Sequence, residues 1–101
     1  MKIFLDDARP APEGWVFVCH VADAISLLKQ CQDEGVPVEA LSLDNDLGLG
    51  EPEGRTVLDW LEEQAFTVQD FRLPDRMLVH SENAPARQRM EAVIARLESL
   101  R

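Results

Sequence analysis

The feature that most constrains this chain is a set of four short apolar runs, each of which ends in polar residues. The runs cover residues 3–5, 15–19, 40–43 and 77–79. They are too short for helices, and three of them are apolar at every position, which is typical of strands covered on both faces in a parallel sheet. The segments between the runs repeat apolar residues at helical spacing. The clearest such stripe consists of Met90, Val93, Ile94, Leu97 and Leu100.

Strands that alternate with helices predict an α/β sandwich of three layers, with about four mostly parallel strands and helices on both faces. A chain of 101 residues holds one such domain, and we assign residues 1–101 to it. One connection is unusual, because residues 7–14 are too few for a helical crossover. We expect a loop there, and the alternative is an antiparallel edge strand. Phe66, Val68 and Phe71 are expected to pack against the core.

Composition excludes several classes of function. Ten Lys and Arg against nineteen Asp and Glu give a formal net charge of −9, which disfavours non-specific binding to DNA, RNA or an anionic membrane. No apolar run approaches membrane length, and no secretory leader is recognisable. Cys19 and Cys31 form no CxxC motif, so we expect reduced thiols and a cytoplasmic location.

Acidic residues follow two of the expected strands. Because the carboxyl ends of parallel strands meet at one edge of a sheet, these residues should converge with the polar residues after the last strand. Carboxylates about 4 Å apart repel by about 1 kcal/mol in water and about 4 at an effective dielectric of 20, so the cluster predicts a bound cation. Oxygen ligands without cysteine favour Mg²⁺ or Mn²⁺. The converging residues are Asp6, Asp7, Asp44, Asp46, His80 and Ser81.

The same edge also suits an anion. A helix that starts near Asn83, with Pro85 in its first turn, would point backbone N–H groups toward it. Arg87 lies within reach of a phosphate bound there. Each feature has a simpler explanation: Asn83 fits a helix cap, Arg87 fits a solvated surface residue, and Asp46, before Leu47, fits a turn as well as a ligand.

These residues resemble the receiver domains of two-component signalling. Asp6-Asp7 looks like the acidic pair that holds magnesium in that family, and Asp44 is similar to the aspartate that accepts the phosphoryl group. Ser81 falls at the receiver Ser/Thr position. The receiver lysine has no counterpart, since the only lysines are Lys2 and Lys29.

A closer resemblance is to the cyclic-phosphate processing receiver domain, through motifs at residues 3–10, 42–48 and 80–83. It implies a reduced receiver-like (flavodoxin-like) fold with strand order 2-1-3-4. It also implies activity on a cyclic phosphate, either an RNA end or a cyclic nucleotide.

The leading hypothesis is a metal-dependent phosphoesterase. Asp6, Asp7, Asp44 and Asp46 are the predicted metal ligands. His80, as general acid or base, Asp44 and Ser81 are the predicted catalytic residues, and Ser81, Asn83 and Arg87 the predicted phosphate ligands. Asp44 is either a nucleophile or only a metal ligand, and activated water is favoured. An acidic rim without basic residues favours a small or terminal phosphate over long RNA.

The alternative hypothesis is a non-catalytic receiver-like module that binds a basic protein partner.

Overall fold

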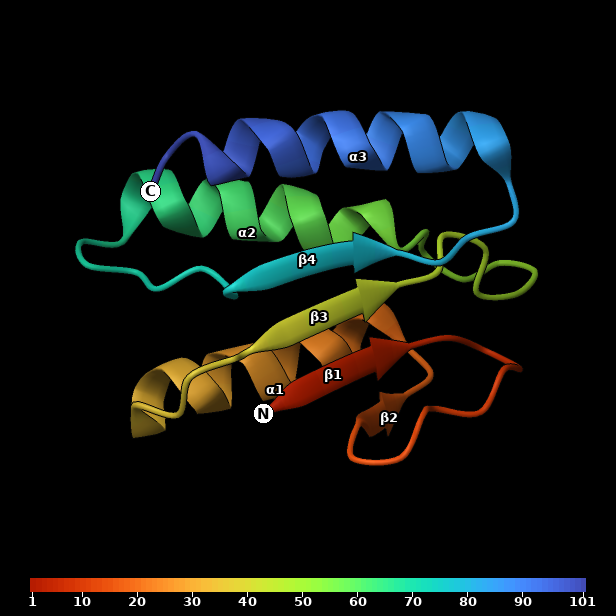
Figure 1. The fold of residues 1–101 in the computed structure, drawn as a ribbon, viewed down its shortest axis with the longest axis horizontal. Helices are drawn as coiled ribbons and strands as arrows, with labels where there is room; N and C mark the ends of the chain where they lie inside the picture. Colours follow the sequence, from red (N-terminus) through yellow and green to blue (C-terminus); the bar gives the residue numbers. More distant parts are fainter.

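Four short strands form one sheet in the order β2-β1-β3-β4, and all three neighbouring pairs are parallel (Figure 1). The computed structural model describes all residues 1–101. The strands are β1 (Lys2–Leu5), β2 (Val16–Val18), β3 (Ala40–Leu43) and β4 (Arg76–Val79). The helices are α1 (Val21–Glu34), α2 (Arg55–Thr67) and α3 (Ala84–Glu98). The predicted α/β class and strand order are therefore confirmed.

The connection between β1 and β2 contains no helix. It is a loop of residues 6–15, and β2 pairs parallel to β1, with Phe4 opposite Phe17. The predicted loop is confirmed, and the antiparallel alternative is wrong. Trp15, at the end of the loop, packs edge-on against Phe4 with ring centroids 6.2 Å apart.

All three helices cover the same face of the sheet. The core is one cluster of 19 buried residues that joins side chains from every helix to Ile3 and Leu5 of β1 and leaves out Phe4 between them. Since side chains alternate along a strand, Phe4 and its cross-strand neighbour Ser42 face the other side. We call that side the open face. It carries no helix, so the expected helical cover on both faces is wrong.

The handedness of crossovers explains this arrangement. The connections from β2 to β3 and from β3 to β4 run in the same direction across the sheet, so right-handed crossovers place α1 and α2 on the same face. The step from β1 to β2 runs the opposite way, and a helix there would have covered the open face. The loop that replaces it leaves that face to the side chains of Phe4 and Trp15.

Three apolar residues that the sequence pattern predicted to be buried are exposed. Phe66 is 72% exposed because it follows Leu61 by five residues, about 140° around α2 from the buried stripe. Val68 and Leu100 lie just beyond the ends of their helices and are also exposed. Phe71 is half-buried against Trp60, as expected, with ring centroids 5.9 Å apart.

Cys19 and Cys31 are both free thiols. Among the helices, not one has the length and apolar character that crossing a membrane demands.

The start of α2 is fixed directly against the end of β3. Gly54 donates its backbone N–H to the carbonyl of Asn45 at 2.9 Å and is buried. A Cβ at Gly54 would lie 2.9 Å from the carbonyl carbon of Asp44 and closer still to its oxygen. Only glycine therefore lets the helix approach this closely.

Replacement of this glycine should disturb both the fold and the position of Asp44. Gly54→Ala is expected to destabilise the protein by about 3 kcal/mol, since backbone atoms must separate to admit the methyl group. In a thermal melt this corresponds to a fall of more than about 10 °C. Gly50→Asn is the control. A Cβ at Gly50 would have no neighbouring atom within 4 Å, and asparagine tolerates the φ of 78° at this position. Equal melting of the two variants would contradict this account.

Candidate functional site

Three carboxylates meet at the carboxyl ends of β1 and β3. Asp6 and Asp7 follow β1, and Asp44 follows β3, where its backbone N–H donates to the carbonyl of Leu5 at 2.9 Å. One oxygen from each of the three side chains lies within 4.8 Å of the other two. A set of carboxylate oxygens at this spacing suits a hard divalent cation such as Mg²⁺ or Mn²⁺.

Asp6 is the anchor of this cluster. Its side chain is buried, and its Oδ1 accepts hydrogen bonds from the backbone N–H groups of Ala8 and Arg9, both at 2.9 Å. Burial on its own would raise the pKa of Asp6, but these hydrogen bonds and the contact with His80 hold the pKa below its ordinary value. Asp6 is therefore an ionised carboxylate inside the fold.

Asp44 has the opposite electrostatic environment. Its Oδ1 accepts one hydrogen bond, from the backbone N–H of Asn45 at 2.8 Å. Burial raises the pKa of Asp44, and the neighbouring carboxylates of Asp6 and Asp7 add to the effect, while Asn45 and His80 oppose it. Burial, with repulsion from the two neighbouring carboxylates added to it, thus disfavours the ionised form of Asp44.

His80 links Asp6 to the open face. Its Nε2 lies 3.0 Å from Oδ2 of Asp6, and its Nδ1 lies 2.7 Å from Oγ of Ser42. An ionised carboxylate only accepts hydrogen bonds. Nε2 of His80 therefore carries the ring proton, and its N–H donates a hydrogen bond to Asp6. The ring also stacks on Phe4, with centroids 4.2 Å apart and planes 4° from parallel. His80 therefore holds the Asp6 carboxylate in a fixed orientation.

The connectivity Ser42–His80–Asp6 has the residue types of a serine hydrolase triad, but its geometry does not support that chemistry. Ser42 lies in the middle of β3 and is 6% exposed, so its hydroxyl does not face a substrate. Ser42 and His80 instead support the carboxylate of Asp6.

Asp46 lies at the edge of the site, outside the group of three carboxylates. Its two oxygens are 3.4 Å from the side-chain nitrogens of Asn45 and Asn83. Asn45 is buried, and it also donates to Glu53 at 2.9 Å and accepts from the backbone N–H of Arg55. Asn45 thereby ties the loop of residues 46–53 to the start of α2.

The predicted phosphate ligands separate into two groups. Asn83 lines the acidic depression, and it also caps α3 by accepting from the backbone N–H of Ala86 at 3.2 Å. Ser81 is buried and accepts from the backbone N–H of Asn83, and Arg87 donates to the carbonyl of Ser81. Neither Ser81 nor Arg87 lines the depression.

One cation does line the acidic depression, although the rim was expected to lack basic residues. Arg9 stands beside the carboxylates and Glu82 in this open depression of about 290 Å³. Both Arg9 and Ser42 lie inside the sequence motifs at residues 3–10 and 42–48, so the motifs contained a signal for them. The complete lining is Asp6, Asp7, Ala8, Arg9, Asp44, Asp46, Glu82 and Asn83.

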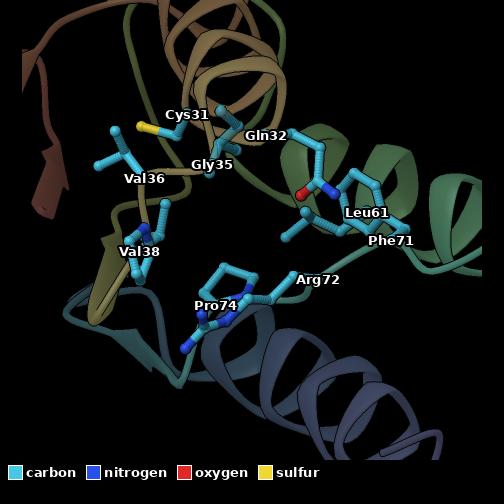
Figure 2. Close-up of a pocket in the computed structure, with 11 residues that line it drawn as sticks. Cys31, Gln32, Gly35, Val36, Val38, Leu61, Phe71, Arg72 and Pro74 are labelled. Carbon is cyan, nitrogen blue, oxygen red and sulfur yellow. The ribbon is translucent and has the colours of Figure 1, made fainter.

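A second cavity, of about 210 Å³, lies next to the amino-terminal ends of β3 and β4 (Figure 2). It is bordered by the end of α1 near Gly35, by Val38 and by Pro74. No aspartate, glutamate or histidine lines it. The carboxylate cluster of Asp6, Asp7 and Asp44 is therefore not part of this cavity.

Comparison with known proteins gives one match. A family model described as a cyclic-phosphate processing receiver domain matches residues 1–96, which include every residue of the acidic depression. No curated protein and no solved structure matches the chain. The match confirms the resemblance carried by the three motifs.

The raised pKa of Asp44 leads to a prediction about the stability of the metal-free protein. Because folding raises the pKa of Asp44, its ionisation favours unfolding at neutral pH, and this cost disappears as the pH falls below the pKa of the unfolded chain. Asp44→Asn should therefore raise the melting temperature by a few degrees, or about 1 kcal/mol, at pH 7 in a chelator. The gain should vanish near pH 3.

The control is Asp70→Asn, at an exposed position with φ 61° that asparagine tolerates. Its melting temperature should stay close to that of the wild type. Loss of stability in Asp44→Asn at pH 7 would show that the hydrogen bond from Asn45 to the carboxylate outweighs the cost of its burial and the repulsion.

Proposed function

Because the chain belongs to the cyclic-phosphate processing receiver domain family, we propose that it is a metal-dependent phosphoesterase that opens a cyclic phosphate at the acidic end of its sheet. The observation that carries the proposal is the convergence of Asp6, Asp7 and Asp44 beside a depression open to solvent. A carboxyl group whose pKa is raised by burial and by neighbouring carboxylates, as that of Asp44 is, is typical of functional sites.

In this proposal Asp6, Asp7 and Asp44 would hold one Mg²⁺ or Mn²⁺, and Asp46 would assist from the rim, outside these three carboxylates. A divalent ion at this position neutralises phosphate oxygens and lowers the pKa of water. Asp6 is the ligand that the protein holds most rigidly, because two backbone N–H groups and His80 fix its oxygens. Asp7 is exposed, so its side chain would be free to adjust to an ion.

The proposed reaction is hydrolysis of the phosphate ring. Water adds its oxygen to phosphorus, one of the two ring P–O bonds breaks, and the released oxygen takes a proton to give an acyclic phosphate monoester. We favour water over Asp44 as the nucleophile, because no lysine lines the depression to balance an acyl-phosphate. Lys2 lies 6.0 Å from the ring of Trp15, and Lys29 lies 6.0 Å from that of Trp60.

His80 has two possible roles in this proposal, and its contacts favour one of them. Both ring nitrogens are engaged with Asp6 and Ser42, and the ring does not line the depression. We therefore propose that His80 acts mainly as a positioning residue for Asp6, in place of direct general acid–base catalysis. Asn83, which lines the depression, remains the proposed polar contact for the phosphate, with Ser81 supporting its backbone.

Metal binding is the first test. In a thermal melt, added Mn²⁺ or Mg²⁺ should raise the melting temperature in proportion to RT ln(1 + [L]/Kd). Asp7→Asn should weaken this effect with little change in the metal-free melting temperature, because Asp7 is exposed. Asp33→Asn, on the exposed surface of α1, is the matched loss of one charge. A wild-type melting curve that does not respond to either metal would favour the non-catalytic module that binds a basic protein.

Turnover is the second test. Phosphorus NMR with a panel of 2′,3′-cyclic and 3′,5′-cyclic phosphates should show an acyclic monoester that forms only with metal. Asp44→Ala should abolish turnover.

His80→Gln should weaken Mn²⁺ binding by about tenfold or more, as expected when a residue that orients a ligand is lost. Reduced turnover with unchanged metal affinity would return His80 to an acid–base role, and failure of every substrate would contradict the enzyme proposal.

A further inference from the structure

The only cationic side chain in the acidic depression, Arg9, has exposed and exchangeable partners. Its guanidinium donates to the carbonyl of His80 at 3.3 Å and to Oε1 of Glu82 at 3.2 Å. The side chain of Arg9 is 46% exposed and that of Glu82 is 90% exposed. An ion pair this exposed contributes little to stability, so its partners separate at small cost.

An anion that enters the depression meets five carboxylates, those of Asp6, Asp7, Asp44, Asp46 and Glu82. One divalent ion offsets two of these charges and leaves a net negative site for a phosphate that is itself negative. A planar guanidinium with five N–H donors is the group that best matches two phosphate oxygens. Arg9 is the side chain in the lining that meets this need.

We propose that Arg9 binds the phosphate of the substrate, and that Glu82 occupies the Arg9 guanidinium until the phosphate displaces it. The inference rests on the proposed function and assigns phosphate binding at that site to Arg9. The position of Arg9 supports it, because the backbone N–H of Arg9 bonds to Oδ1 of Asp6. The carboxylate proposed to hold the ion thus also fixes the loop that carries the guanidinium.

The exchange of partners also defines the class of substrate. One guanidinium accommodates one phosphate group, and the surrounding carboxylates repel any further phosphates of the same ligand. The site should therefore accept a small cyclic phosphodiester or a single terminal phosphate. Polyphosphates and internal stretches of RNA should bind much more weakly.

The test measures binding of inorganic phosphate by calorimetry at a fixed, saturating Mg²⁺ concentration. Arg9→Ala should weaken binding by about tenfold to a hundredfold, the range for loss of charge-assisted hydrogen bonds. Glu82→Gln should tighten binding by about two- to fivefold. Arg72→Ala is the control, because Arg72 makes a similar exposed ion pair with Asp75, at 3.3 Å, and lies outside the depression. The Arg72→Ala variant should bind phosphate with the affinity of the wild type.

The double variant Arg9→Ala/Glu82→Gln separates competition from simple repulsion. If Glu82 competes for Arg9, then Glu82→Gln should tighten phosphate binding less when Arg9 is absent. An equal gain in both backgrounds would overturn the exchange of partners. A larger loss in Arg87→Ala than in Arg9→Ala, or no phosphate binding by the wild type, would overturn the assignment of Arg9.

The outcome is distinguishable from failure of the proposed function. Arg9→Ala keeps the backbone N–H that supports Asp6 and removes a positive charge from the depression, so the stabilisation by Mn²⁺ should be retained or increased. Phosphate binding that depends on Arg9, without turnover of any cyclic phosphate, would support the inference and contradict the proposed hydrolysis. Turnover that is unaffected by Arg9→Ala would support the proposed hydrolysis and contradict the assignment of Arg9.

Discussion

The alternation of side chains along β1 is the constraint on which the rest of the structure depends. Ile3 and Leu5 enter the core, and Phe4 between them turns to the open face. Asp6, one residue beyond the strand, keeps the phase of Phe4, so the ring of His80 can stack on Phe4 and hydrogen-bond Asp6 together. A shift of one residue in the register of β1 would send Phe4 into the core and separate these contacts.

Much of this arrangement could be predicted from local patterns. Short apolar runs that end in acids specify both buried parallel strands and an acidic edge, because the same residues end the strands and form the cluster. The short connection between β1 and β2 favoured a loop in place of a helix, but its length left an antiparallel β2 open as the alternative. The cap at Asn83 followed from its position before Pro85, and the structure shows the corresponding hydrogen bond to Ala86.

The parts that were missed depend on contacts between distant segments. The single helical layer follows from the direction of two crossovers, which requires the strand order and the handedness rule together. The contact between Ser42 and His80 joins residues 38 positions apart, and a residue in the middle of a strand carries no local sign of it. Arg9 was recognisable only as part of a motif, since its role depends on the carboxylates around it.

The open face has a consequence for how such a protein can change through evolution. The buried cluster between the sheet and the three helices provides the stability, while Phe4, Ser42 and His80 lie on the opposite surface of the same strands. Substitutions at these positions can retune the acidic centre without repacking the interior. Packing of the core and orientation of the acidic cluster are thus assigned to alternate positions along the strands, so that a change in one need not disturb the other.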